Sequence, residues 1–405
     1  MSWPMVKLGD VLSIIRGITF KPNDQVEPLS EGSTIVMRTK NVQRSGLDIS
    51  DLIAVPNSFI KRDEQYLRSE DMLISSANSW DLVGKISFIE KLPANSTAGG
   101  FISIIRAKKE KVIPKYLYYW LTLEHTQIKI RNCGQKTTNI SNLNLERFKE
   151  LFIPLPSLND QRRIVAILDK ATGICQKREQ TIKLTDDFLR ATFLEIFGDP
   201  VGNPKEWKKN KIKKGVLNIT SGWSATGENI PCKFDEFGVL KISSVTSGTF
   251  KPEENKVVAS ESIPASKKLI HPKKGDLLFS RANTRELVAA ICMVHQDYDN
   301  LFLPDKLWSI KLNHELLLPE FFLILMQNEK VRELLTKQAT GTSGSMLNIS
   351  KNKFEETEII FPEINVQKDF CNAFRKTINL KATLIKSYEL ANESLNSLSQ
   401  KVFQQ

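Results

Sequence analysis

The chain of 405 residues is long enough for two or three domains, and its 41% hydrophobic and 25% charged residues are ordinary for a soluble globular protein. It has no apolar run of roughly 18 residues, no secretory-signal layout and no CxxC pair among its scattered cysteines, which together predict a reduced cytoplasmic protein. The net charge of +11 favours a polyanionic partner such as nucleic acid, although many basic proteins bind none.

The first part of the chain, residues 1–158, predicts a mixed domain of strands and helices. Short apolar segments at 34–37, 71–75 and 85–89, bounded by Gly, Asn and Ser, are typical of β-strands. Residues 114–129 predict a helix, because a proline suits the first helical turn and the apolar residues after it share one face. We therefore expect an α+β domain with several loops.

Residues 159–199 predict one long helix. This segment has no proline, and its apolar residues recur at seven-residue intervals. The positions that form this stripe are Leu168, Cys175, Ile182, Leu189 and Ile196. A helix of about 37 residues would extend roughly 55 Å, and a stripe with this spacing is typical of a helix–helix seam.

The second half of the chain repeats the first. DMLISSANSWDLVGKISFI at 71–89 and DLLFSRANTRELVAAICMV at 276–294 are identical at eight of nineteen positions without a gap. The equivalence continues to the end, so residues 200–364 predict a second α+β domain, with a helix at 319–337, and residues 365–405 predict a second long helix. The second seam comprises Phe374, Tyr388, Leu395 and Val402, and Lys381 interrupts it.

We expect the two long helices to pack on each other, because each alone would expose its apolar stripe. The first leads from one domain to the other and the second must return, so the pair is expected to be antiparallel. The alternative is two unrelated amphipathic helices on separate domains, which the matching length and phase disfavour. The predicted fold class is α+β: two tandem, pseudo-twofold-related mixed domains separated by a long antiparallel coiled-coil pair of helices, with two equivalent docking surfaces for a partner.

Motifs of catalysis are missing from the sequence. There is no GxxxxGK[ST] phosphate loop, no GxGxxG between a strand and a helix, and no adenine-methyltransferase signature. The four histidines lie far apart, and Glu254-x-Lys256 has no paired upstream acid of the kind that a nuclease site requires. We therefore predict no catalytic residue, no metal ligand and no cofactor for this chain.

Each half closes with the same order of short motifs: a glycine loop, Asn-Ile-Ser, a hydrophobic segment with proline, a Gln and the long helix. These are Gly134, Asn139-Ile140-Ser141, Pro156 and Gln161 in the first half, and Gly341, Asn348-Ile349-Ser350, Pro362 and Gln367 in the second. Over essentially the whole chain, this doubled layout resembles the DNA-specificity subunits of type I restriction–modification systems. The sequence departs from that pattern at Val366, where an acid usually precedes the Gln, and at Lys381.

The resemblance implies a non-catalytic subunit that reads a bipartite DNA target. In this family each domain is a target recognition domain for one half-site, and the helices form the spacer between them. The helices also dock two methyltransferase subunits and, through them, restriction and translocase subunits. S-adenosylmethionine, ATP and Mg²⁺ are then expected only on those partner subunits. The alternatives are a scaffold whose helical hairpin joins two non-DNA domains, and a specificity subunit of another methylation-based defence system.

Comparison of the two halves indicates which residues would read DNA. If both domains share a fold but read different bases, positions with the same residue in both halves should maintain the fold. Positions that differ within an otherwise identical stretch should then contact the bases. Around the shared Ser-x-Ala-Asn the mismatched pairs are Ser76/Arg281, Ser79/Thr284 and Trp80/Arg285. Because Arg makes bidentate hydrogen bonds to guanine, Arg281 and Arg285 are the first candidates in the second domain, supported by Thr284.

The glycine loops form a second candidate site, because small hydroxyl residues let a backbone approach phosphates and Lys136 adds charge. The candidates are Lys136, Thr137 and Thr138 in the first loop and Thr342, Ser343 and Ser345 in the second. A solvated linker without DNA contact is the alternative. A third set follows predicted strands and comprises Arg38, Lys40, Arg44 and, in the second half, Lys241. Solvated surface charge is an equally open interpretation of this set.

Overall fold

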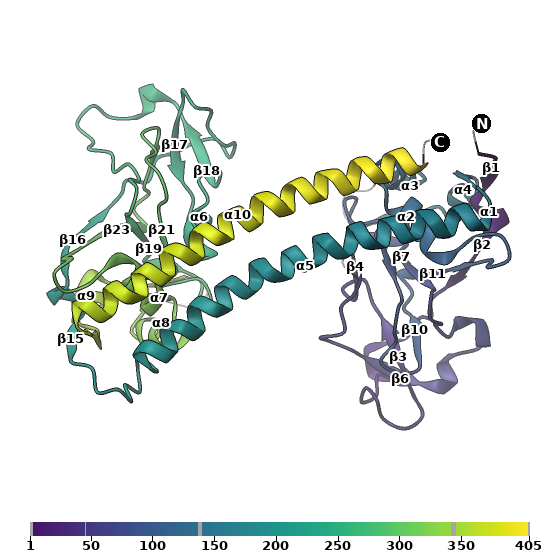
Figure 1. Ribbon diagram of the computed structural model, residues 1–405, viewed down its shortest axis with the longest axis horizontal. Coiled ribbons are helices and arrows are strands. Elements are labelled where there is room, and N and C mark those ends of the chain that lie inside the picture. Colours follow the sequence, from purple (N-terminus) through teal and green to yellow (C-terminus); the bar gives the residue numbers. More distant parts are fainter. Residues whose placement is uncertain (1–2, 45, 137–139, 342–345, 404–405) are drawn as a thin grey trace. The chain divides into compact units, whose positions relative to one another are not determined.

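The computed structural model describes residues 3–44, 46–136, 140–341 and 346–403 of the chain. The chain divides into two compact units: unit 1 comprises residues 1–179 with 385–405, and unit 2 comprises residues 180–384. The division falls inside two 40-residue helices, α5 (Leu158–Phe197) and α10 (Ile364–Phe403), so each unit contains a globular part and a portion of each helix (Figure 1). The boundaries expected from the sequence instead treat the two helices as separate segments.

Each unit is built on a four-stranded antiparallel sheet, and the strand order is the same in both. In unit 1 the order is β2 (Leu12–Arg16), β11 (Ile102–Ala107), β7 (Met72–Ser75) and β9 (Ile86–Phe88). In unit 2 it is β16 (Val216–Ser221), β23 (Leu307–Leu312), β19 (Leu277–Ser280) and β21 (Ile291–Met293). The repeat in the sequence is therefore also a repeat of topology.

Strand β7 is apolar throughout because a separate core covers each face of its sheet. The side chains of Met72 and Ile74 pack in one hydrophobic cluster and that of Leu73 packs in another, and all three are fully buried. In β19 the same alternation places Leu278 in a different cluster from its neighbours. Successive side chains of a strand point to opposite faces, so a continuous apolar run is typical of a strand that is covered on both sides.

Each unit also contains a three-stranded sheet with one parallel pair. The strands are β10 (Ser96–Ala98), β3 (Ser33–Met37) and β6 (Ala54–Pro56) in unit 1, and β22 (Leu301–Phe302), β17 (Phe237–Leu240) and β18 (Asn255–Val258) in unit 2. β10 runs parallel to β3, and β22 runs parallel to β17. The segments that follow each parallel pair therefore leave the sheet at the same edge.

Short elements complete the globular part of each unit. The two-stranded pairs are β1 (Met5–Lys7) with β14 (Phe152–Pro154), β4 (Val42–Gln43) with β5 (Gly46–Leu47), and β15 (Lys209–Lys211) with β25 (Glu358–Ile360). The short helices are α1 (Leu8–Val11), α4 (Leu145–Lys149), α6 (Ser243–Thr246) and α9 (Lys351–Glu356). Pairs β1–β14 and β15–β25 join the beginning of each globular part to its end, as expected of a self-contained domain.

Two helices lie where the sequence predicted one. In place of single helices at 114–129 and 319–337, the structure has α2 (Pro114–Thr122) with α3 (Glu124–Asn132) and α7 (Pro319–Gln327) with α8 (Glu329–Lys337). The prediction was therefore wrong about continuity. At Asn328 the side-chain oxygen accepts hydrogen bonds from the backbone N–H groups of Lys330 and Val331, so this residue caps a new helix instead of continuing the first.

The long helices pack as an antiparallel pair, as predicted (Figure 1). Within unit 1 the first half of α5 meets the end of α10, and Leu168 and Phe403 belong to the same hydrophobic core. Within unit 2 the end of α5 meets the start of α10, where the Phe193 and Phe370 rings have centroids 5.6 Å apart. The predicted seam residues Leu168, Cys175, Leu189 and Phe374 are buried, and Ile182, Ile196, Tyr388, Leu395 and Val402 are half-buried.

Lys381, which interrupts the second seam in the sequence, is paired across the helices. Its side chain is 21% exposed, and its Nζ lies 2.6 Å and 2.7 Å from the two carboxylate oxygens of Asp186 on α5. A charge in a helix seam is tolerated when an opposite charge on the facing helix satisfies it. The interruption is therefore compatible with the packing.

The Gln of each repeat motif attaches the long helix to the globular part of its unit. Gln161 Oε1 accepts a hydrogen bond from the backbone N–H of Ile113 at 2.8 Å, and its Nε2 donates to the Pro156 carbonyl at 3.0 Å. Gln367 makes the equivalent bonds with Leu318 and Pro362 at 2.9 Å and 2.8 Å. Both side chains are fully buried, so a side chain with one donor and one acceptor group is required at both positions.

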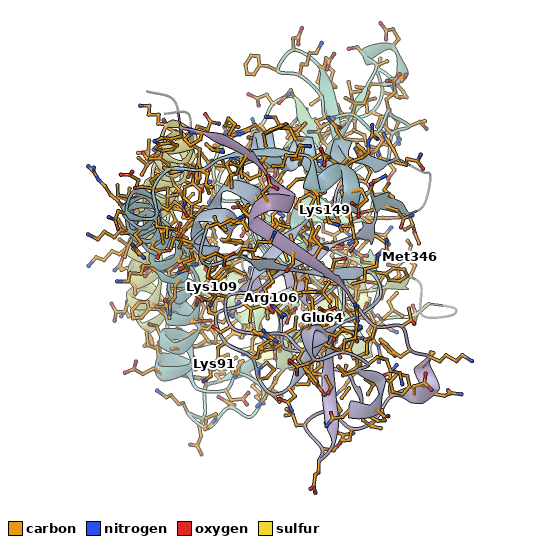
Figure 2. The ribbon with its side chains drawn as sticks, turned by 90° about the vertical axis from the view of Figure 1, so that its right-hand side faces the viewer. Glu64, Lys91, Arg106, Lys109, Lys149 and Met346 are labelled. Atoms are coloured by element: carbon orange, nitrogen blue, oxygen red, sulfur yellow. The ribbon has the colours of Figure 1, made fainter. Side chains whose placement is uncertain are left out.

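An ion pair that contains a buried aspartate braces the central sheet of each unit. Arg106 donates from Nε to Asp71 Oδ1 at 2.8 Å and from Nη2 to Asp71 Oδ2 at 2.7 Å, and Figure 2 shows Arg106 beside Glu64, whose carbonyl accepts from Nη1 at 3.2 Å. This hydrogen-bonded pairing with Asp71 raises the pKa of Arg106. In unit 2 the equivalent pair is Lys311 with Asp276. The repeat thus retains the charge pair while exchanging Arg for Lys.

Gly84 and Ala289 occupy the same turn and should respond differently to substitution. Both have positive φ, +81° and +63°, and a Cβ on Gly84 would lie 2.7 Å from Ile130 Cγ2. We expect Gly84→Ala to lower the free energy of unfolding by about 1–3 kcal/mol, from left-handed strain and overpacking. The matched Ala289→Gly should change it by less than about 1 kcal/mol, because relief of strain offsets the added chain entropy. Denaturant unfolding followed by circular dichroism measures both, and equal effects would contradict this account.

Two further findings concern the cysteines and the possibility of a membrane-spanning helix. All five cysteines are free thiols. In the part of the chain that the structure describes, none of the helices combines the length and apolarity that crossing a membrane requires.

Candidate nucleic-acid interface

Two segments that the sequence predicts as separate contact sites, the loop after the central strand and the glycine loop, pair with each other. In unit 1, β8 (Ala77–Asn78) pairs with β13 (Ser141–Leu143), which also pairs with β12 (Gly134–Gln135). In unit 2, β20 (Ala282–Asn283) pairs with β24 (Leu347–Asn348). Backbone hydrogen bonds therefore hold the two predicted segments side by side in each unit.

A third segment, the turn after each parallel strand pair, joins them. The backbone N–H of Ser76 donates to the carbonyl of Phe101 at 2.9 Å, and that of Arg281 donates to the carbonyl of Lys306 at 3.1 Å. We refer to the first loop cluster as residues 76–82, 99–101, 134–136 and 140–143, and to the second loop cluster as residues 281–287, 303–306, 340–341 and 346–349. The predicted residues Thr137, Thr138, Thr342, Ser343 and Ser345 lie outside the described residues.

The first loop cluster presents hydroxyl groups, an aromatic ring and a lysine amine. Ser79 is exposed, and the half-buried Ser76 has its Oγ 2.8 Å from Ser103 Oγ. Lys136 Nζ lies 5.9 Å from the centroid of the half-buried Trp80 ring, within range of a cation–π interaction. The lysine predicted to contact phosphate and the Trp80 predicted to read bases therefore lie together.

The second loop cluster carries two arginines in different settings. Arg281 is half-buried, and its Nε donates to the Asp305 carbonyl at 2.8 Å while its Nη1 donates to Asn348 Oδ1 at 2.9 Å. Arg285 is exposed, and no residue that the structure describes forms a hydrogen bond or ion pair with its side chain. Thr284, half-buried, lies between them in the chain. Arg285 is thus open to an external acceptor, whereas Arg281 is held in position.

Comparisons with known proteins show which proteins this chain is similar to. Residues 2–184 match the family model described as the type I restriction modification DNA specificity domain. The chain is 25% identical to the EcoKI specificity subunit of Escherichia coli strain K12, with 99% of this chain and 87% of that protein aligned. The StySPI specificity subunit of Salmonella potsdam is 20% identical over the same shares. The first part of the chain thus matches a type I DNA specificity domain, and nearly the whole chain is similar to type I specificity subunits.

Solved structures share the fold of this chain. The type I restriction–modification S subunit from M. genitalium aligns with 100% of this chain and 97% of its own, with a TM-score of 0.55 and 14% identity. A chain from a structural study of complex assembly in a type I system aligns with 100% of this chain and 98% of its own, with a TM-score of 0.55 and 15% identity. At such low identity these structures support the fold alone.

Two of the four cations in the third predicted set, Arg38 and Lys40, are neutralised. Arg38 Nη2 lies 3.1 Å from Asp51 Oδ1, and Lys40 pairs with the other oxygen of the same carboxylate. Lys241 is half-buried, and its carbonyl accepts a hydrogen bond from the Ser244 hydroxyl at 2.7 Å. These residues lie outside the two loop clusters as defined. A phosphate would therefore have to compete with Asp51 for the first two cations.

Arg44, which like Lys40 is exposed, lies near a buried amine. The side chain of Lys85 is buried, with its Nζ 3.1 Å from Gln43 Oε1. Burial, with the nearby positive charge of Arg44 as the smaller cause, lowers the pKa of Lys85. Arg44 therefore repels a neighbouring cation, whereas Arg38 and Lys40 are neutralised.

Three residues of the loop clusters were absent from the sequence-based candidates. Phe101 is 60% exposed in the first cluster, and Asp305 and Lys306 are half-buried in the second. Their turns come directly before β11 and β23, far in sequence from the loop after β7 or β19. Comparing the two halves at residues 99–101 and 304–306 would have shown the same kind of mismatch that selected Arg281.

The relatives that the chain matches are named as specificity subunits, the non-catalytic components of type I systems. Among the described residues, no group of three or more His, Cys, Asp or Glu side chains is placed to hold a metal ion. The two loop clusters bring together backbone loops, hydroxyl groups and cations, and they stay the predicted DNA-binding surfaces.

Proposed function

We propose that each unit reads one half of a bipartite DNA target through its loop cluster, and that α5 and α10 set the length of unread DNA between the half-sites. The observation that carries this proposal is a common backbone frame with different side chains: equivalent strand pairs present Ser76, Ser79 and Trp80 in one unit and Arg281, Thr284 and Arg285 in the other. A shared frame with exchanged side chains suits modules that bind the same kind of polymer but select different bases.

Genome-wide mapping of methylated adenine tests this function. In cells that carry the cognate methyltransferase, the wild-type gene should produce methylation at a split motif with a fixed gap, and its deletion should abolish that methylation. A continuous motif, or methylation that persists without the gene, would refute the proposal. Replacing unit 2 residues should alter only one half of the motif.

Lys136 is expected to contribute to DNA binding through phosphate and not through base recognition. Lys136→Ala should weaken binding to specific and random duplexes alike and reduce the slope of log affinity against log salt by about 1. Fluorescence anisotropy at several salt concentrations measures both quantities. Lys129→Ala, on α3 and outside the first loop cluster, removes the same charge as a control. A change of base preference at an unaltered slope would contradict the phosphate role.

The helical pair is proposed to dock two methyltransferase subunits and, through them, restriction and translocase subunits. Apolar side chains on the long helices remain exposed: Ile167, Ile174, Ile385 and Leu390 in unit 1, and Leu184, Phe188, Leu194 and Leu380 in unit 2. Several exposed apolar side chains on one element favour a protein–protein interface. S-adenosylmethionine, ATP and Mg²⁺ would then act on the partner subunits, and the isolated chain should transfer no methyl group from labelled S-adenosylmethionine to DNA.

Charge placed on this helical surface should prevent docking. Leu184 and Phe188 are 54% and 56% exposed and stand one helical turn apart, so Leu184→Asp with Phe188→Asp should lower affinity for the methyltransferase by at least about tenfold. Analytical size exclusion of the mixed subunits measures complex formation. The matched control is Phe234→Asp, which is 96% exposed but lies outside both long helices. Equal effects of the two changes would contradict a docking site on the helices.

A further inference from the structure

The guanidinium of Arg281 is held by two other segments of unit 2. Its Nε donates to the carbonyl of Asp305 at 2.8 Å, and its Nη2 lies 3.4 Å from Asp305 Oδ2. Its Nη1 donates to Asn348 Oδ1 at 2.9 Å. Asp305 is itself restrained, because its carboxylate accepts from the Ser224 hydroxyl and its backbone N–H donates to the same oxygen at 3.3 Å. The guanidinium plane therefore has a defined orientation before any ligand binds.

These contacts leave part of the guanidinium fork unused. Asp305 occupies the edge formed by Nε and Nη2, and Asn348 engages Nη1. Each terminal nitrogen carries two hydrogens, so each retains one N–H that is bonded to no residue the structure describes. Two parallel N–H donors at the end of an arginine match N7 and O6 of guanine in the major groove.

Unit 1 has no counterpart of this arrangement. The equivalent strand pairings of the two units place Gly100 where unit 2 has Asp305, and Ser76 where it has Arg281. The Ser76 hydroxyl instead lies 2.8 Å from the Ser103 hydroxyl. The Asp305 carboxylate thus lies in the same loop cluster as Arg281. Any effect of removing this carboxylate should be confined to the half-site read by unit 2.

We propose that Asp305 is a positioning and specificity-determining residue, which presents the end of the Arg281 fork to one guanine of the second half-site and restrains Arg281 from binding phosphates. This inference rests on the proposed function. A mobile arginine at a DNA surface binds any phosphate, because that attraction is independent of sequence. A carboxylate beside the arginine repels phosphate and offsets the cationic charge, so tight contact requires the paired acceptors of a base.

The test uses the complex of the specificity subunit with its methyltransferase. The probes are a duplex carrying the motif found by methylation mapping, duplexes in which each G·C pair of the second half-site is replaced in turn, and a random duplex. The wild-type complex should lose roughly 5- to 150-fold in affinity at one G·C position, as expected for a bidentate contact. In Asp305→Ala that loss should fall below about threefold, and binding to the random duplex should tighten with a steeper salt dependence.

Two further variants separate charge from geometry. Asp305→Asn keeps a side-chain acceptor without the charge, so it should raise affinity for the random duplex while retaining part of the base discrimination. Glu315→Gln removes an acidic charge from an exposed position of unit 2 outside the second loop cluster, and it should leave both quantities unchanged. In every variant the first half-site should be read as in the wild type, which also shows that the complex is folded.

Different results would contradict the proposed role of Asp305 and the proposed DNA-reading function of the chain. Unchanged base discrimination in Asp305→Ala, an equal loss at every position of both half-sites, or a wild-type second half-site without dependence on any G·C pair would each overturn the role of Asp305. A wild-type complex that recognises no split motif would refute the proposed function instead. Loss of the same discrimination in Arg281→Ala, with retention of first half-site recognition, is expected in addition.

Discussion

Replacing Arg281 and Arg285 together by alanine is expected to abolish recognition of the second half-site while the first half-site is still read. Both residues lie in the second loop cluster, and Arg285 is exposed while Arg281 is held by Asp305 and Asn348. Each bidentate base contact that is lost should remove about 1–3 kcal/mol of discrimination. Methylation mapping in cells that produce the double variant measures the outcome as a motif degenerate in one half.

The control for this double variant removes the same charge elsewhere in unit 2. Lys208→Ala with Lys214→Ala changes two exposed lysines outside the second loop cluster and should leave the motif intact. If the arginine variant methylates the same split motif as the wild type, these arginines do not select bases. If both halves of the motif degenerate together, the variant acts on the whole subunit and not on one reading surface.

Gln161→Leu is expected to destabilise unit 1 by about 2–5 kcal/mol. The substitution leaves the Ile113 N–H and the Pro156 carbonyl without their buried partner, and it does so where α5 joins the globular part. Each orphaned buried group costs about 1–3 kcal/mol. Denaturant unfolding followed by circular dichroism should show an earlier transition for the variant.

Two matched substitutions serve as controls for the expected destabilisation by Gln161→Leu. Gln176→Leu makes the same change at an exposed position of α5 and should alter stability by no more than about 0.5 kcal/mol. Gln367→Leu removes the equivalent bonds in unit 2 and should lower stability by a similar amount to Gln161→Leu. A Gln161→Leu protein as stable as the exposed control would show that the hydrogen bonds of this side chain do not hold the helix in place.

Several elements of the fold were predictable because their signals are local or periodic. A seven-residue apolar stripe without proline is sufficient for α5 and α10, and the strands at β3, β7 and β9 follow from short apolar runs. The break between α7 and α8 was missed. Asn328 acts there as a helix cap, and an asparagine within an apolar periodic segment does not by itself reveal which role it takes.

The candidate site was predictable only in part. The mismatch between repeats selected Arg281 and Arg285, and the glycine loop selected Lys136, and these roles stay predictions. Asp305 was missed because its significance depends on Arg281, which lies 24 residues away in the chain and contacts it only once β19 and β23 are paired. Conversely, nothing in the sequence distinguishes Arg38 and Lys40 from unpaired surface cations, but folding brings Asp51 against both.

The sequence alone established a duplicated chain with two mixed domains and two long helices, and a resemblance to type I specificity subunits, because duplication, heptad spacing and motif order can all be found along the chain. Only the tertiary structure decided which side chains share a surface and which charges remain available. The physical reason is that strand pairing and burial join residues far apart in the chain, so the Asp305–Arg281 contact, the pairing of Lys381 with Asp186 and the buried Gln161 exist only in the folded protein.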